Sequence, residues 1–210
     1  MPNHITNVIL ASPEVVDAIT RNHTEEEIAA NRKQYAETQA RYKERTGNDW
    51  PYPADDMTER IVDFAMVVPE PANIYHDGCN GQHPHVVDGQ EMVCWYDWNV
   101  RNWGTKWNAY DTSVTPQPGD LCELRFDTAW SHPAPVIEAL SEKFPDEIIE
   151  VAFADEDFGS NCGRYKIKGG AVREQFFPDY GEESRRLAAE VKYPGMTLEE
   201  LEAEWAEADA

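Results

Sequence analysis

The stretch LCELRFDTAWSHPAPVIEALSEKFPDEIIEVAFA, residues 121–154, predicts a strand, a helix and a second strand in direct succession. Apolar and charged residues alternate over 122–127, as they do in a half-buried strand. Ser131 is the expected N-cap of a helix in which apolar residues recur at helical spacing over 136–144. Pro145 ends that helix, because its ring cannot continue an α-helix.

The chain beyond this helix predicts a β-hairpin. Apolar positions alternate over 147–154 and again over 164–168, and the acidic turn DEDFGSNCG, 155–163, separates the two runs. The turn lacks the ligand spacing of a calcium loop, so we interpret it as a hairpin turn. The charged residues of these strands, which include Glu123, Arg125, Glu150 and Lys166, predict a solvated second face of the sheet.

Towards the N-terminus the sequence predicts a first strand over 4–11 and a helix that starts at Ser12-Pro13. A long solvated helix follows over 24–45, with Thr24 and Glu27 as a capping box, inside an insertion at about 22–56.

Between this insertion and residue 121, the segment IVDFAMVVP, 61–69, predicts a central strand, and 91–103 a helix that stops at Gly104.

The C-terminal residues 179–210 predict a helical extension that packs on the main domain, 1–178. Thr197 and Glu200 form a second capping box, and the last helix is amphipathic and acidic. The order of elements indicates an α+β protein with a split β-α-β arrangement, in which helices cover one face of an antiparallel sheet.

Composition restricts the class of partner. Forty Asp and Glu against 18 Lys and Arg give a formal net charge of −22. Such a charge repels nucleic acid and anionic membranes, so we expect no direct nucleic-acid binding and no membrane binding, and a protein with a basic surface as the partner. Solubility alone is the alternative explanation of the acidity. The sequence has neither an apolar run long enough for a transmembrane helix nor a signal-peptide pattern, and its four scattered cysteines favour a cytoplasmic protein.

A loop rich in His and Cys is the one candidate for a metal site. Its ligand types suit zinc, although the spacing matches no standard finger or ribbon. The candidates are His76, Cys79, His83 and His85, with Cys94 nearby. A polar surface loop without metal is the alternative interpretation, and no other cofactor is expected. The sequence contains no nucleophile elbow, P-loop or dinucleotide-binding motif, so we expect no enzyme activity.

Four tryptophans fall within WYDWNVRNWGTKW, residues 95–107. Trp95 and Trp98 share one face of the expected helix, while Trp103 and Trp107 lie on either side of Gly104, where a strand is expected to start. Packing of a helix end against a strand start explains this cluster, and an exposed protein-binding patch is the alternative. The candidate protein-binding residues are Trp95, Trp98, Glu199, Glu200 and Trp205.

Two short segments that contain tryptophan resemble those of a known family. The segments Asn102–Trp107 and Phe126–Ser131, with Pro133, and the opening Met1–Asn3 resemble the phage- and plasmid-borne YubB-type family. His4 and Ile5 depart from the usual start of that family. The resemblance implies a ferredoxin-like αβ domain, a role as an accessory protein of a mobile element and a bacterial cytoplasm. It implies structural roles for Trp103, Gly104, Trp107, Trp130 and Ser131.

Three functions follow in order of preference. The first is a non-enzymatic, acidic protein-binding module, for example an inhibitor of a host nucleic-acid-binding or defence factor. The second is a metal-binding protein or enzyme that uses the His/Cys loop, and the third is a structural or assembly component of a phage particle.

Overall fold

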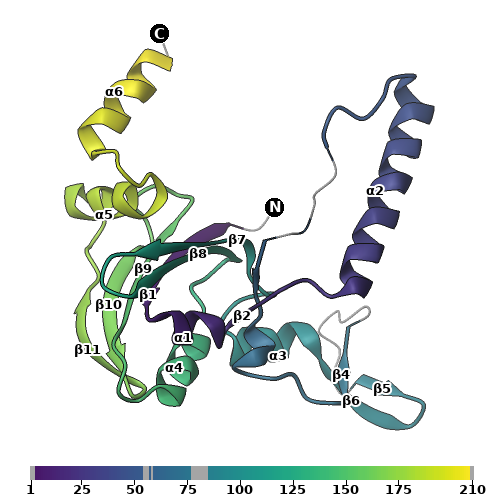
Figure 1. Ribbon diagram of the computed structural model, residues 1–210, viewed down its shortest axis with the longest axis horizontal. Coiled ribbons are helices and arrows are strands. Elements are labelled where there is room, and N and C mark those ends of the chain that lie inside the picture. Colours follow the sequence, from purple (N-terminus) through teal and green to yellow (C-terminus); the bar gives the residue numbers. More distant parts are fainter. Residues whose placement is uncertain (1–2, 54–56, 58, 77–84, 209–210) are drawn as a thin grey trace.

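A computed structural model describes residues 3–53, 57, 59–76 and 85–208 of the chain (Figure 1). Its centre is a six-stranded sheet with the spatial order β11-β10-β9-β1-β8-β7, and every pairing in it is antiparallel. The strands are β1 (His4–Ala11), β7 (Tyr110–Gln117), β8 (Leu121–Ala129), β9 (Ile149–Asp155), β10 (Gly163–Lys168) and β11 (Ala171–Phe176). The predicted strands at 4–11, 121–127 and 147–154 and the predicted hairpin are confirmed.

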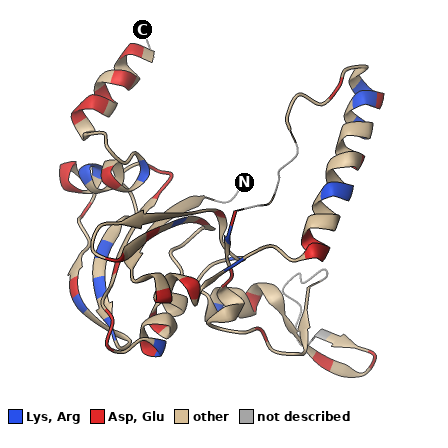
Figure 2. Cartoon of the chain, viewed as in Figure 1, with Lys and Arg blue, Asp and Glu red and all other residues tan. Residues whose placement is uncertain are grey.

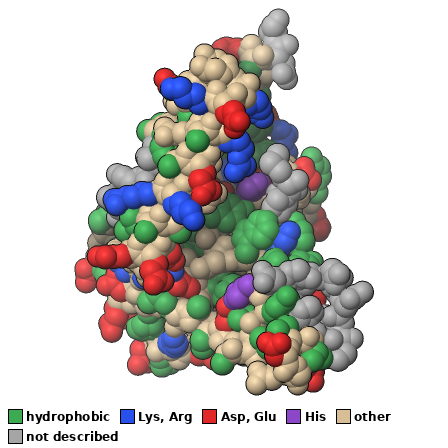
Figure 3. All heavy atoms as spheres, turned by 90° about the vertical axis from the view of Figure 1, so that its right-hand side faces the viewer, with side chains coloured by type: hydrophobic (Ala, Val, Ile, Leu, Met, Phe, Trp, Pro, Cys, Tyr) green, Lys and Arg blue, Asp and Glu red, His purple; other side chains and the backbone are tan. Residues whose placement is uncertain are grey.

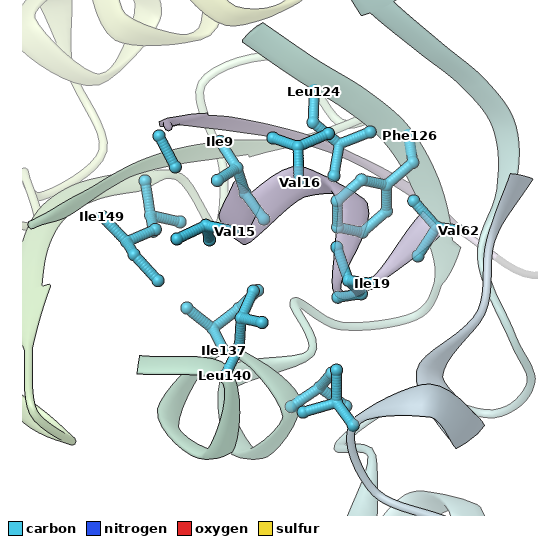
Figure 4. Close-up of a cluster of buried hydrophobic side chains, with 14 of the residues drawn as sticks. Ile9, Val15, Val16, Ile19, Val62, Leu124, Phe126, Ile137, Leu140 and Ile149 are labelled. Carbon is cyan, nitrogen blue, oxygen red and sulfur yellow. The ribbon is translucent and has the colours of Figure 1, made fainter. Parts of the chain in front are cut away.

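The split β-α-β arrangement is also confirmed, because β1 lies between β8 and β9. Helix α1 (Pro13–Asp17) follows β1, and helix α4 (Ala134–Lys143) connects β8 to β9. Both helices pack on the same face of the sheet (Figure 4). The core between these layers is mostly apolar, with Val15 and Val16 from α1, Ile137 from α4, and Ile9 and Phe126 from the sheet all at most 1% exposed.

The second face of the sheet is only partly solvated, contrary to the expectation from its charged residues. Helix α5 (Glu182–Lys192) lies on this face, and its Leu187 and Val191 pack with Ala154 of β9. The Arg125 guanidinium donates two hydrogen bonds, of 2.8 and 2.6 Å, to the carbonyl oxygen of Val191. The cation therefore caps the C-terminal end of α5, where carbonyl groups lack helical partners.

Helix α6 (Leu198–Ala208) follows α5 and packs on it through Leu198 and Leu201. The expected capping box at its start is confirmed, since the Thr197 N–H donates to the Glu200 carboxylate at 2.8 Å. Acidic residues gather on α6 and at the start of α2, whereas α5 carries both signs of charge and Lys and Arg occur along the rest of α2 and on β10 (Figure 2).

Between α1 and β7 the chain forms the elements that the ferredoxin-like sheet does not include. These are β2 (Thr20–Arg21), α2 (Glu25–Thr46), β3 (Ile61–Val62), the 3-10 helix η1 (Phe64–Met66), β4 (Ile74–Tyr75), β5 (His85–Val87), β6 (Gln90–Cys94) and α3 (Trp95–Asn102). Strands β2 and β3 form one small ladder, and β4, β6 and β5 form another.

Helix α2 projects from the body of the molecule and buries none of its residues (Figure 1). Its 22 residues span about 33 Å. The predicted capping box of Thr24 and Glu27 is present, and Gly47 ends the helix at φ +74°. Arg21 fixes the base of the helix, because its guanidinium binds both carboxylate oxygens of Glu27 and reaches Asp63 at 2.5 Å.

Three sequence predictions about local structure are wrong. Segment 61–69 contributes no strand to the main sheet, because the Asp63 carboxylate accepts the Ala65 N–H and starts η1. The helix predicted at 91–103 begins only at Trp95, since residues 90–94 pair as a strand. The N-cap of α4 is Pro133 and not Ser131, whose hydroxyl is used elsewhere.

Candidate functional site

The two tryptophan motifs, 103–107 and 130–135, contact each other at one end of the sheet. Gly104 has φ +77°, and a Cβ added there would lie 2.7 Å from the Pro135 Cδ atom. The Ser131 hydroxyl donates to the Gly104 carbonyl oxygen at 2.6 Å. A glycine is therefore required for both backbone conformation and close approach, and Ser131 holds the two motifs together instead of capping the helix.

Further bonds fix the same junction. The Thr105 hydroxyl donates to the Ala129 carbonyl oxygen at 2.6 Å, and the Trp103 indole N–H donates to the Val68 carbonyl oxygen at 2.9 Å. Trp103 is 4% exposed and packs edge-on against Phe64. Trp103 is thus part of the core, as predicted, with its single polar atom satisfied.

A polar network centred on His132 lies on the core side of the junction, as we call the contact between the two tryptophan motifs. Its Nδ1 is 2.7 Å from the Asn7 Oδ1 atom, and its Nε2 is 2.7 Å from the Tyr165 hydroxyl. Because the Asn7 amide NH₂ donates to Thr128, the Asn7 oxygen accepts from Nδ1–H, and the Tyr165 hydroxyl donates to Nε2. The ring also stacks on Phe153 at 4.5 Å. Every polar atom of the imidazole is therefore satisfied in its neutral form.

Burial lowers the pKa of His132 to about 3, because a charged imidazolium would lose its hydration. Burial also raises the pKa of the Tyr165 hydroxyl above its ordinary value. A neutral histidine with both nitrogens occupied by protein groups has no free lone pair for general-base catalysis. The network positions the turn after β8 and leaves the outer side of the junction as the candidate site.

The outer side of the junction carries aromatic side chains around one lysine. We call Trp95, Tyr96, Lys106, Trp107 and Trp130 the indole–lysine cluster. The Lys106 Nζ atom lies 4.5 Å from the ring centroids of both Trp107 and Trp130. The Tyr96 ring lies edge-on to Trp130 at 6.0 Å and to Trp95 at 5.8 Å. These distances are those of cation–π and T-shaped aromatic contacts.

Trp130 combines two unusual properties. Its φ is +75°, a conformation that costs a residue with a Cβ about 1–2 kcal/mol, and its side chain is 42% exposed. The backbone N–H of Trp130 donates to the Asn3 carbonyl oxygen at 2.8 Å, which places Trp130 next to the start of β1. A strained backbone that presents a large apolar ring to solvent is typical of a functional position.

Acidic side chains lie at the same end of the sheet. His4 pairs with Ala129, the neighbour of Trp130, and its Nδ1 lies 2.8 Å from the Tyr110 hydroxyl. Burial, and then the negative charges of Asp127, Asp111 and Glu156, raise the pKa of Tyr110 to about 12. Burial likewise raises the pKa of the Asp127 carboxyl above its usual value. We call Tyr110, Asp111, Asp127 and Glu156 the acidic sheet end.

The candidate protein-binding tryptophans differ in their surroundings. Trp95 is half-buried in the indole–lysine cluster, and Trp98 packs against the main core, 5.4 Å from Trp103. Trp205 packs between α5 and α6, 5.0 Å from Phe158.

The candidate glutamates of α6 have partners within the chain. Glu199 forms an ion pair with Arg186 at 2.5 Å, and Glu200 belongs to the capping box. The Glu199 carboxylate therefore fixes α6 on α5, and the Glu200 carboxylate caps the start of α6.

The structure brings together few residues of the predicted metal loop. His76 lies 3.3 Å from the Glu70 carboxylate, and Cys94 is buried at the start of α3. Cys79, His83 and the side chain of His85 lie outside the described residues. Within the described part of the chain, no group of three His, Cys, Asp or Glu could hold a metal ion. Likewise, no helix among the described residues is long and apolar enough to cross a membrane.

A hollow of about 370 Å³ on the second face of the sheet is an alternative candidate site. Its floor is apolar and includes Val8, but its charged rim is already paired, as in the 3.0 Å contact between Lys166 and Glu150. On the side of the molecule that carries α2, hydrophobic side chains surround a central hollow and basic side chains gather above it (Figure 3). The hollow on the second face is lined by none of the residues with positive φ.

Comparison with known proteins agrees with the fold. Residues 102–197 match a family model described as a ferredoxin-like domain in Api92-like protein. Among solved structures, the chain is similar to the crystal structure of protein api92 from Yersinia pseudotuberculosis, with 12% identity and a TM-score of 0.49 over 87% of this chain and 100% of that one. No curated protein sequence matches the chain. The expected ferredoxin-like domain is confirmed, and a phage or plasmid origin stays a prediction.

Proposed function

We propose that this chain is a non-enzymatic protein-binding module whose partner presents a basic surface. Two features at one end of the sheet support this proposal. The indole–lysine cluster offers one exposed ring, Trp130, beside three half-buried aromatic rings, and aromatic rings supply much of the binding energy at protein interfaces. The acidic sheet end offers negative charge beside those rings, and the chain as a whole has a formal net charge of −22.

The two features have different roles in binding. Carboxylates attract a basic partner over distances of about 10 Å at moderate salt, so they increase the rate of encounter. Aromatic rings act after contact, when burial of their apolar area lowers the rate of dissociation. A partner that normally binds nucleic acid has a basic surface of this kind, and we therefore propose competition with phosphate as the consequence of binding.

The observation that carries the proposal is Trp130, which is strained in its backbone and exposed in its side chain. A purely structural tryptophan would be buried, as Trp103 is. Internal stability alone gives no reason to keep a large apolar ring in solvent at a cost in backbone energy, whereas an interface does.

The experiment compares proteins captured from bacterial lysate by the wild-type chain, by Trp130→Ala and by Tyr180→Ala. Tyr180 is 74% exposed and lies outside the cluster, so its substitution controls for loss of an exposed ring. We expect a specific set of proteins to be retained by the wild type and by Tyr180→Ala, to be lost with Trp130→Ala and to elute as salt rises. Capture that is independent of both Trp130 and salt would contradict the proposal.

A further inference from the structure

The position of Lys106 between two indole rings goes beyond a general binding surface. Its Nζ atom lies at the same distance, 4.5 Å, from the centroids of Trp107 and Trp130. A cation between two aromatic faces is the arrangement by which proteins recognise ammonium groups. The two rings come from different motifs, held together by the Ser131 hydroxyl and the Gly104 carbonyl group.

Among the described residues, Lys106 is the one cation that lies over two aromatic rings at once. Some other cations, such as Lys43 and Lys166, instead lie 2.8–3.0 Å from a carboxylate. For Lys106, by contrast, the described residues include no carboxylate within ion-pair distance, and the two rings are its charge partners. The two rings therefore hold the Lys106 ammonium without a carboxylate of the described residues beside it.

We infer that Trp107 and Trp130 form a cation receptor for a lysine or arginine side chain of the protein partner, and that Lys106 occupies this receptor until the partner displaces it. The inference rests on the proposed function and names the group that the surface recognises. The Lys106 ammonium is carried on a flexible four-carbon stem, so it can leave the rings without disturbing the junction behind them. Trp130 is 42% exposed, which leaves its ring accessible to an incoming side chain.

The resident lysine makes the receptor weaker than it would otherwise be. A partner cation must compete with Lys106 for the same ring faces, and this competition reduces its apparent affinity. An exposed cation–π contact is worth a factor of about five in binding. Removal of the Lys106 ammonium is therefore expected to strengthen binding of a free cation by about fivefold.

The test uses tetramethylammonium as a probe that needs no knowledge of the partner. Nuclear magnetic resonance spectra of the indole N–H groups follow its titration into the wild type, Lys106→Ala and the double variant Lys106→Ala/Trp130→Ala. Lys106→Gln serves as a second variant without the charge, and Lys166→Ala is a matched lysine control. The neutral isostere 3,3-dimethyl-1-butanol shows whether charge is required.

We expect the Trp107 and Trp130 indole resonances to shift with tetramethylammonium at about fivefold lower concentration in Lys106→Ala and Lys106→Gln than in the wild type or Lys166→Ala. The double variant should lose the response, and the neutral isostere should not produce it. Equal half-saturation in the wild type and Lys106→Ala, or an equal response to the isostere, would overturn the inference. Such a result leaves the proposed function intact, because that proposal is tested separately, by the dependence of capture from lysate on Trp130 and on salt.

Discussion

The buried neutral His132 makes the stability of this protein depend on pH in a defined window. Burial lowers the pKa of His132 to about 3 in the folded chain, whereas an unfolded histidine titrates near 6.5. Below pH 6.5 the imidazole therefore binds a proton in the unfolded state but stays neutral in the folded state. The free energy of unfolding consequently falls as pH decreases towards 3. Between pH 7 and pH 5 these two values correspond to a loss of about 2 kcal/mol in the free energy of unfolding.

Urea denaturation at pH 7 and pH 5 measures this loss, for the wild type and for His132→Gln. The substitution removes the titrating group, so its free energy of unfolding should change by about 2 kcal/mol less between the two pH values than that of the wild type. His76→Gln is the matched control, because His76 is 63% exposed in its side chain and lies outside the network. An equal pH dependence of the wild type and His132→Gln would refute the claim that His132 is held neutral by burial.

Three further substitutions test other parts of the structure. Gly104→Ala should lower the free energy of unfolding by about 2–4 kcal/mol, as measured by urea denaturation. The alanine would have a left-handed backbone conformation, and its Cβ would clash with Pro135. A loss under about 0.5 kcal/mol would contradict the packing of the two motifs. Asp127→Asn should raise the melting temperature at pH 7 and have no such effect below about pH 4. The reason is that the pKa of Asp127 is raised, so its charged form destabilises the folded chain. A melting temperature that falls at pH 7 would be inconsistent with this. Arg21→Ala should return the pKa of Glu27 from about 2 towards 4.5, as followed by a carbon-detected pH titration, and an unchanged value would show that Arg21 does not hold the base of α2.

The strands and helices around residues 121–168 were predictable because local patterns and packing agree there. Apolar residues at every second position identified β8, β9 and β10, and apolar residues at helical spacing identified α4. The capping boxes at the starts of α2 and α6 were also found, since each depends only on residues three positions apart.

Segment 61–69 shows why apolar runs are ambiguous. Its apolar residues suit a buried strand, but Asp63 caps a 3-10 turn, and Phe64 packs on Phe126 in the core. Ser131 was misassigned for a similar reason: a serine before a helix can cap it, but here a neighbour distant in sequence, Gly104, receives its hydroxyl hydrogen bond. Tertiary contacts decided both outcomes.

The candidate site could be predicted only in part. The tryptophan motifs were visible in the sequence, but their spacing could not show that Trp103 is buried while Trp130 is exposed. The position of Lys106 between Trp107 and Trp130 depends on contact across 24 residues of chain, which no periodicity reveals. A lysine next to a tryptophan in a highly acidic chain was the one available signal.

Quantitative mass spectrometry of proteins retained by the wild type and by Trp130→Ala, eluted in steps of increasing salt, is the most direct test of partner binding. The account predicts proteins with basic surfaces that elute from the wild type as salt rises and that Trp130→Ala fails to retain, while Tyr180→Ala retains them. Identical sets of retained proteins for the wild type and Trp130→Ala would contradict the claim that this end of the sheet is a protein-binding site.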